Sequence, residues 1–511
     1  MERVPTLKSE LAAVVKKNPG HLIATSACLG GELSSCIVEM EHARKIEDTE
    51  TAKKKHQQIK DFMFFCNDLF GDDFYVEVAP GASKDQIIAN NKLAQIAQVF
   101  HKKLIIGDDA HYLKKEDRYI HKAYLNSKGG ERETDAFYEY AYLQSDEDIR
   151  NNLEPSIGML IEEMYANSME MFDKIEVYNL LHSQTIPSVP IINYHQATPE
   201  ACEYWYEHYP NLARMLTSDD IYERYWINEC DNALHKMFNR NGYDKKGDQY
   251  YKVLDEEARV KRIIGEKLGT NMFKYPITLK YYIDMMWECG SLVGAGRGSS
   301  CAALNHYLLG ITQLDPIEWN LPFFRYMNEE RVELGDIDID ICPSKKGTIV
   351  KKIKEERGSR FNPDIDELSR KNLGCTLIAT YGTEQTKSAV LTACRGYRSE
   401  DYPDGIDNDE AQYIASLIPS ERGFLWPLED VINGNKDKGR EPVYVFVKEV
   451  SMYPGLLNII FGIVGLVNKR SSHASGVILF DEDPYEFGCF MKTPKGEVIT
   501  QYDLHDCEAA G

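Results

Sequence analysis

Two short motifs in the middle of this chain combine residue types and spacings that suit phosphate and metal chemistry. The first is the glycine-rich stretch Gly-Ala-Gly-Arg-Gly-Ser at 294–299, and the second is Gly-Asp-Ile-Asp-Ile-Asp at 335–340. Backbone N–H groups in a glycine turn can hold phosphate oxygens, and clustered carboxylates can hold Mg²⁺ against those phosphates. Together the two motifs are typical of a metal-dependent nucleotidyl transfer.

Each motif also has a plainer interpretation. A Gly-x-Gly-x-Gly turn often only connects two elements, and a dinucleotide-binding turn is disfavoured because Gly298 falls one residue early for Gly-x-Gly-x-x-Gly. The aspartates alternate with isoleucine, which predicts a strand with Asp336, Asp338 and Asp340 on one face, and not a calcium loop. Three like charges on one face repel each other unless a cation neutralises them, so metal binding is the favoured interpretation.

The elements around these motifs predict a mixed α/β chain. An expected helix at 280–289 and an apolar strand at 292–293 lead into the glycine turn, and a helix at 301–309 follows it. Residues 146–270 are helix-rich, aromatic and acidic without a chemical motif, so they predict connecting and packing structure. A strand at 376–380 enters a further helix. Side chains suited to phosphate or nucleic acid occur from there on, although a lone histidine is more often structural: Lys387, Arg395, Lys469, Arg470 and His473.

Residues 1–145 alternate short apolar strands with helices. Strands are expected at 21–25, 74–78 and 103–107, and Ser83 with Gln86 predicts the start of a helix. This order suggests part of an α/β barrel, in which sites form just beyond the strand ends. Three side chains that can bind metals lie at such positions, although an Asp-x-His pair is common by chance: Cys28, Asp109 and His111.

Composition narrows the class of protein. A chain of 511 residues is too long for one core, and three or four domains are expected. The 43% hydrophobic and 27% charged content is that of a soluble protein, and the chain has neither a long apolar run nor a signal peptide at its start, so we expect a cytoplasmic protein without membrane partners. Twelve cysteines without a Cys-x-x-Cys pair argue against a zinc ribbon or a disulfide framework. The net charge of −22 restricts any DNA contact to a local basic groove.

In their order along the chain, these motifs resemble the bacterial DNA polymerase III alpha subunit, the C-family replicative polymerase. The similar segments are 26–32, 108–113, 294–299, 309–312, 328–332, 336–340, 380–383, 417–419 and 473–477. The resemblance implies a multidomain α/β fold: a partial PHP-type α/β barrel followed by a polymerase-beta-like nucleotidyltransferase palm with a helical thumb. The implied boundaries are 1–145 for the partial PHP-like domain, 146–270 for a helical connecting region, 271–345 for the first part of the palm, 346–455 for the thumb-like region and 456–511 for an incomplete second part of the palm.

The resemblance further implies a DNA-directed DNA polymerase that adds dNTPs to a primer 3′-hydroxyl by a two-metal mechanism. Asp336 and Asp338 would be catalytic and carry two Mg²⁺ ions, while Asp340 would be structural. The implied nucleotide-binding residues are Gly296, Arg297, Gly298, Ser299, Arg331 and Lys387. The implied contacts to DNA or phosphate are Arg395, Lys469, Arg470 and His473. A PHP-like site for Zn²⁺ or Mn²⁺ would consist of Cys28, Asp109 and His111.

Several family features are missing from this sequence. The early His-x-His motif, the strand with the third catalytic aspartate, and the fingers are absent, so we expect an incomplete polymerase that is weakly active or inactive alone. Its expected partners are primer-template DNA, dNTPs, a separately encoded C-terminal polymerase fragment, the sliding clamp and other replisome subunits, in the host cytoplasm if a phage encodes it. Two alternatives stay open: a PHP-type metal-dependent phosphoesterase, and a non-catalytic remnant that binds a partner chain.

Overall fold

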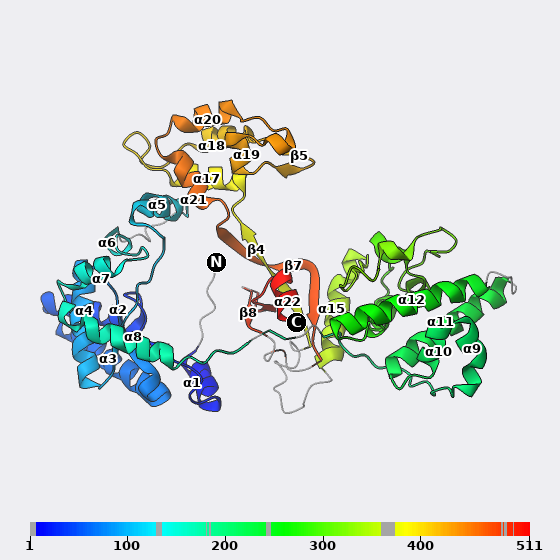
Figure 1. Ribbon diagram of the computed structural model, residues 1–511. Coiled ribbons are helices and arrows are strands. Elements are labelled where there is room, and N and C mark those ends of the chain that lie inside the picture. Colours follow the sequence, from blue (N-terminus) through cyan, green and yellow to red (C-terminus); the bar gives the residue numbers. More distant parts are fainter. Residues whose placement is uncertain are drawn as a thin grey trace. The chain divides into compact units, whose positions relative to one another are not determined.

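The computed structural model describes residues 7–128, 135–179, 181–182, 185–241, 247–358, 374–481, 484, 488–493 and 495–511. The chain divides into two compact units, and each unit combines two separate stretches of sequence (Figure 1). Unit 1 consists of Met1–Tyr178 and Tyr381–Lys469, and unit 2 consists of Asn179–Thr380 and Arg470–Gly511. Both contain helices and strands, which confirms the predicted mixed α/β class.

The first stretch of unit 1 contains a three-stranded parallel sheet in the order β1-β2-β3. Its strands are β1 (Ala24–Thr25), β2 (Phe74–Val78) and β3 (Leu104–Ile106). The helices of this stretch are α1 (Lys8–Lys17), α2 (Glu32–Lys45), α3 (Thr49–Phe70), α4 (Lys84–Val99), α5 (Arg118–Ser127), α6 (Asp135–Tyr138), α7 (Asp146–Leu153) and α8 (Ile161–Asp173). The hydroxyl of Ser83 accepts a hydrogen bond from the N–H of Gln86 at 3.2 Å, so α4 begins where its sequence predicts.

The second stretch of unit 1 is mostly helical. Its elements are α17 (Thr386–Gly396), α18 (Asn408–Ser416), the hairpin of β5 (Ser420–Glu421) and β6 (Phe424–Leu425), α19 (Leu428–Asn433), α20 (Tyr444–Ser451) and α21 (Leu456–Ile463). None of the described helices alone is long and apolar enough to cross a membrane; α20 and α21 meet that test only as a pair, bent by 113°.

Helix α5 belongs to the first stretch of unit 1 but packs against α17 and α21 of the second (Figure 1). Two glycines make this contact close. A Cβ atom on Gly396 would lie 1.8 Å from the carbonyl oxygen of Ala123, and one on Gly462 would lie 2.5 Å from Cγ2 of Ile120. Any larger residue at either glycine would push α5 away, so these two positions join the two stretches of unit 1.

Unit 2 begins with a helical region around one large apolar core. Its helices are α9 (Glu203–His208), α10 (Pro210–Leu216), α11 (Ile221–Asn241), α12 (Gly247–Leu268) and α13 (Lys274–Glu288). The fully buried Trp226 of α11 packs edge-on against Phe273 at a ring distance of 5.2 Å. Helix α13 starts six residues before its predicted start because Pro276 falls in the first turn, where the missing N–H costs nothing.

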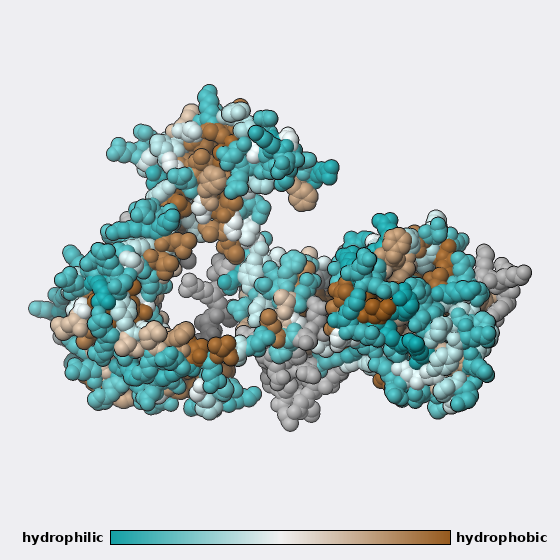
Figure 2. Space-filling model, in the orientation of Figure 1, coloured by the Kyte–Doolittle hydropathy of each residue, from teal (hydrophilic) through white to brown (hydrophobic). Residues whose placement is uncertain are grey.

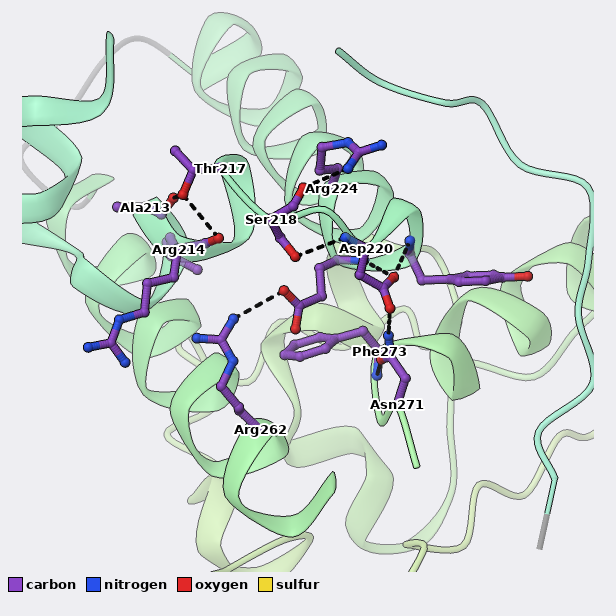
Figure 3. Close-up of polar contacts among 12 residues, drawn as sticks. Ala213, Arg214, Thr217, Ser218, Asp220, Arg224, Arg262, Asn271 and Phe273 are labelled. Carbon is purple, nitrogen blue, oxygen red and sulfur yellow. Dashed lines mark hydrogen bonds and ion pairs between the residues drawn. The ribbon is translucent and has the colours of Figure 1, made fainter. Parts of the chain in front are cut away.

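Polar contacts fix α12 against the start of α11 (Figure 3). Asp220 accepts the N–H of Tyr222 at 2.7 Å, and its other carboxylate oxygen accepts the side-chain N–H of Asn271 at 2.7 Å. Arg262 of α12 donates to the carboxylate of Glu223 at 3.2 Å. One contact is made from within α12, at Arg262, and another from just beyond its end, at Asn271. Together they fix the position of α12 and therefore of its buried residues.

The rest of unit 2 contains the segments that carry the two motifs and a four-stranded sheet in the order β7-β4-β9-β8. The elements are the 3₁₀ turn η5 (Gly298–Ala302), α14 (Leu304–Leu308), α15 (Lys346–Gly358), β4 (Cys375–Thr383), β7 (Val467–Leu479), β8 (Phe490–Lys492), β9 (Val498–Thr500) and α22 (Leu504–Ala510). Strand β9 pairs parallel to β4 and antiparallel to β8. Strands β4 and β7 each include residues of both units.

Candidate active site

The structure brings the glycine turn (294–299) and the aspartate segment (335–340) together in unit 2. The N–H of Gly294 donates to the carbonyl oxygen of Asp340 at 2.9 Å, and a Cβ atom on Gly294 would lie only 3.0 Å from Cβ of Asp340. The guanidinium of Arg297 pairs with a carboxylate oxygen of Asp338 at 3.0 Å. The two motifs that suggested phosphate and metal chemistry therefore form one site.

The aspartate segment has the predicted alternation but not the predicted strand. Asp336, Asp338 and Asp340 are exposed, whereas Ile337 and Ile339 are half-buried against the core. Within the described residues, the segment makes no strand ladder, and only Ile341 forms an isolated bridge, to Val293. The glycine turn follows Val293 directly, and its backbone bends away too soon for pairing to continue.

Two glycines of the turn are required for different reasons. Gly296 has φ of +125°, and a Cβ atom there would lie 2.7 Å from Sγ of Cys301 and 3.1 Å from Cγ2 of Thr312. Gly298 has φ of +70°, but a Cβ atom there would meet nothing within 4 Å. The turn thus needs glycine at 296 for both space and backbone conformation, and at 298 for conformation alone.

Two tyrosines that the sequence analysis did not single out, Tyr275 and Tyr326, border the aspartate segment. Burial raises the pKa of Tyr275 to about 12, and the negative charges of Asp336 and Asp338 add to this shift. The ring of Tyr326 lies against Gly335, where a Cβ atom would come within 2.6 Å of Cε2. Neither tyrosine belongs to a recognisable motif, so only the tertiary fold shows that both flank the carboxylates.

Other predicted residues of unit 2 lie in simpler surroundings. Arg331 is exposed and pairs with Glu333. His473 lies on β7, where its Nδ1 accepts the N–H of Gly476 at 2.6 Å and that of Ser475 at 3.3 Å. Since Nδ1 is an acceptor, the imidazole of His473 carries its proton on Nε2, which leaves that nitrogen as a donor.

Three further predicted residues belong to unit 1. Lys387 and Arg395 are exposed on α17. Lys469 lies on β7 beside Gly382 of β4, where a Cβ atom would be 3.3 Å from Cβ of the lysine. The predicted contact residues are therefore divided between the units: Lys387, Arg395 and Lys469 in unit 1, and Arg297, Arg331, Arg470 and His473 in unit 2.

A second group of predicted site residues lies in unit 1, beyond the carboxyl ends of β1 and β3. Nε2 of His111 lies 3.4 Å from a carboxylate oxygen of Asp109. Burial raises the pKa of the Cys28 thiol, and a hydrogen bond with Asp109 raises it further. Ala27 and Asp109 both have left-handed backbone conformations, with φ of +61° and +48°. Strain in non-glycine residues just beyond the ends of two strands of one sheet is typical of functional sites.

Glu77 is a member of this cluster that the sequence did not reveal. Its carboxylate accepts the hydroxyl of Thr25 at 2.6 Å, and its negative charge contributes to the raised pKa of Cys28. Gly107 makes room for it, since a Cβ atom there would lie 2.1 Å from Oε1 of Glu77. Searched over the described residues, the chain has no group of three or more His, Cys, Asp or Glu side chains arranged to hold a metal ion.

An apolar hollow adjoins this cluster. It is lined by residues of α5, α21, the loop after β3 and the start of β7, among them His111, Leu113, Ile120, Phe461 and Val467. Figure 2 shows brown, apolar surface over this part of unit 1. His121 of α5 also lines the hollow, and its burial lowers its pKa to about 4, so this imidazole is neutral at physiological pH.

Comparison with known proteins shows which family the chain belongs to. Residues 224–511, more than half of the chain, match the family described as the bacterial DNA polymerase III alpha NTPase domain. This chain belongs to that family. The matched region contains both the glycine turn and the aspartate segment, so the polymerase III alpha resemblance predicted from the sequence is confirmed.

Three relatives illustrate the range of similarity. A protein of Bacillus subtilis named as a probable DNA polymerase, YorL, is 37% identical over 100% of this chain, and a protein of Bacillus phage SPbeta named DNA-directed DNA polymerase has the same identity and coverage. The DNA polymerase III subunit alpha of Aquifex aeolicus is 26% identical over 98% of this chain. The chain spans 38% of the first two relatives and 39% of the third.

Proposed function

We propose that this polymerase III alpha chain forms the nucleotide-binding part of a DNA-directed DNA polymerase, which adds dNTPs to a primer 3′-hydroxyl. The observation that carries this proposal is the ion pair between Arg297 and Asp338, because it joins the phosphate-binding turn to the carboxylates that would hold the metal. Membership of the family and the polymerase names of the relatives support it.

The donor atoms of the site fit Mg²⁺. Asp336 and Asp338 offer exposed carboxylate oxygens, and Mg²⁺ is bound in such enzymes by one or two carboxylates together with substrate phosphates and water. When bound, two Mg²⁺ ions would activate the attacking hydroxyl and stabilise the leaving pyrophosphate. Asp340 takes a structural role in this proposal, since its backbone already accepts the N–H of Gly294.

The chain's own residues would orient the triphosphate. The backbone N–H groups of Gly296, Gly298 and Ser299 form the cradle, in which the absence of side chains at both glycines lets phosphate oxygens approach the main chain. Arg297 lies in the same turn, and its guanidinium would exchange part of its contact with Asp338 for the phosphates when the nucleotide binds. The positive charge would then neutralise phosphate charge without leaving the site.

We assign the remaining basic residues to the nucleic acid and its substrate. Arg331 and Lys387 would contact the nucleotide, and Arg395, Lys469, Arg470 and His473 would contact phosphates of primer-template DNA. The domain organisation predicted from the sequence, with a PHP-like domain, a palm and a thumb, is the arrangement that this assignment requires. The sliding clamp, other replisome subunits and a separately encoded polymerase fragment are the proposed partners.

Binding of a dNTP tests the proposed function directly. A fluorescent dNTP analogue titrated into the purified chain is expected to bind saturably in excess Mg²⁺ and not with EDTA, because Mg²⁺ would join the carboxylates to the phosphates. Competition by unlabelled dNTP, followed by anisotropy, shows that the site recognises the nucleotide. A chain that binds no dNTP at any Mg²⁺ concentration would contradict the proposal and favour the non-catalytic remnant.

The strained cluster in unit 1 supports a second candidate function, a metal-dependent phosphoesterase. We propose that Cys28, Asp109 and His111, which do not form a metal-binding group in the described structure, converge to bind Zn²⁺ or Mn²⁺, with Glu77 nearby. Thiolate, imidazole and carboxylate are the ligands of Zn²⁺, and the effect of Asp109 on the pKa of the Cys28 thiol supports placing these two groups in one site. The raised pKa of the thiol means that the metal has to displace its proton.

Metal affinity at this cluster is therefore expected to rise with pH. Each bound Zn²⁺ releases the Cys28 proton, so affinity should increase about tenfold per pH unit from pH 7 to 8.5, below the raised pKa of the thiol. Competition with a chromophoric chelator measures this slope. The variant Cys28→Ser should lose both affinity and slope, whereas Cys36→Ser, at a buried cysteine of the same unit, should keep them. Equal slopes in all three proteins would refute the assignment.

A further inference from the structure

A buried carboxylate of α12 holds the helix that follows the glycine turn. Glu257 is fully buried, and its two oxygens accept three N–H groups at the start of α14. The donors are the backbone N–H of Leu304 at 2.6 Å, the backbone N–H of Asn305 at 3.0 Å and the side-chain amide of Asn305 at 2.7 Å. Charge-assisted bonds of this kind are the strong ones in protein interiors, so α14 is fixed to α12.

A buried histidine of α14 continues this connection to the turn. Nδ1 of His306 lies 2.9 Å from the carbonyl oxygen of Ser300. Since a carbonyl oxygen only accepts, Nδ1 carries the proton. Burial lowers the pKa of His306 to about 3, and the positive charge of Lys261 acts in the same direction, so the imidazole stays neutral and keeps this tautomer. Its Nε2 has no hydrogen-bond partner in the part of the chain that the structure describes.

Two further contacts reach the residues that would touch phosphate. The hydroxyl of Ser300 donates to the carbonyl oxygen of Arg297 at 2.9 Å. The backbone N–H of Gln313, which follows α14, donates to the carbonyl oxygen of Ala295 at 2.8 Å. The turn is thus tied at one end to α14 and at the other to the segment that follows α14, and the carbonyl of Arg297, whose side chain pairs with Asp338, is held within it.

Lys261 balances the charge of this buried group. It is fully buried one turn after Glu257 on α12. Its Nζ lies 4.0 Å from Sδ of Met327, and the negative charge of Glu257 acts on it. Burial lowers the pKa of Lys261 to about 8, although the negative charge of Glu257 opposes this shift. An apolar core would be simpler, since burying two opposite charges gives little net stability.

We propose that Glu257 and His306 are positioning residues that hold the backbone of the glycine turn in its phosphate-binding conformation. The inference rests on the proposed nucleotide site and adds to it the part of the protein that preorganises it. A turn with φ of +125° and +70° at two glycines is costly to order, and in the absence of these bonds the nucleotide would have to supply that ordering on binding.

The test compares replacements of His306 that differ in whether, and where, the side chain carries a hydrogen-bond donor. The side-chain amide of Asn can reach the place of Nδ1 and donate to Ser300, whereas Leu has no donor and the longer Gln places its amide near Nε2. We expect His306→Leu and His306→Gln to weaken Mg²⁺-dependent dNTP binding about tenfold, and His306→Asn to bind within about threefold of the wild type. The matched control is Asn167→Leu, which removes a buried donor to the carbonyl of Leu104 in unit 1 and should leave dNTP affinity unchanged.

Hydrogen exchange separates this inference from the proposed function. Amides of 295–301 should exchange faster in His306→Leu and His306→Gln than in the wild type, with slow exchange restored in His306→Asn, whether or not the chain binds dNTP. If the wild type binds no dNTP but the exchange pattern holds, the positioning stands and the nucleotide proposal fails. If His306→Leu does not fold, the Asn and Gln variants decide. Equal affinity and equal exchange in Asn and Gln would overturn the inference.

Discussion

Replacing Asp336 and Asp338 together with alanine is expected to abolish Mg²⁺-dependent dNTP binding, with a rise in Kd of at least ~100-fold, or roughly 2.8 kcal/mol. Both carboxylates are exposed, so their removal takes nothing from the core. It does remove the oxygen ligands that would join Mg²⁺ to the triphosphate, and it frees Arg297 from its ion pair. Anisotropy titration with a labelled dNTP measures the change, and circular dichroism confirms that the variant is folded.

Asp340→Ala is the matched control for this double variant. It removes an exposed carboxylate from the same face of the same segment, but it leaves the backbone bond from Gly294 to residue 340 in place. We expect its affinity to stay within about threefold of the wild type, as for most exposed substitutions. If Asp340→Ala were as damaging as the double variant, Asp340 would have to be counted among the metal ligands.

Gly296→Ala is expected to have the second large effect, a loss of local stability of about 3 kcal/mol or more together with loss of dNTP binding. The new Cβ atom would lie 2.7 Å from Sγ of Cys301 and 3.1 Å from Cγ2 of Thr312, and φ of +125° is a region that alanine rarely adopts. The turn would have to move, and its N–H groups would no longer converge. The urea midpoint and the dNTP affinity report the two consequences.

Gly298→Ala serves as the comparison because it shares the positive φ but not the crowding. Its Cβ atom would enter open space, so only the left-handed backbone is penalised, by about 1 kcal/mol. The folded variant should still bind dNTP, with a loss of less than about tenfold. Equal effects at 296 and 298 would show that backbone conformation, and not the contact with Cys301 and Thr312, determines the shape of the turn.

The sequence predicted those parts of the site that depend on short-range pattern. The outward direction of Asp336 and Asp338 follows from their alternation with isoleucines that need burial. The start of α4 follows from the capping side chain of Ser83. The strand expected at 335–340 did not form as a ladder, because strand pairing requires a neighbouring extended segment and the neighbour here is a turn.

The supporting residues could not be predicted, because their roles depend on contacts distant in sequence. Glu257 lies within 146–270, for which the sequence indicated only connecting and packing structure, yet it bonds to Leu304 and Asn305, 47 and 48 residues further on. Tyr275 acquires its raised pKa from burial and from carboxylates some sixty residues away. A buried glutamate on a helix has no distinctive spacing, so the tertiary fold was needed to reveal it.

The division of the chain into two interleaved units has a consequence for the order in which the protein is made. Synthesis proceeds from the N-terminus, and domains usually fold as they emerge from the ribosome. Unit 1 cannot be completed until residue 469 has been added, by which time the whole 179–380 stretch of unit 2 has already been released. Helix α5 therefore stays with the face that receives Gly396 and Gly462 incompletely covered until Gly462 has been added, more than 300 residues after α5 ends. A nascent chain halted between 381 and 469 would contain neither unit whole.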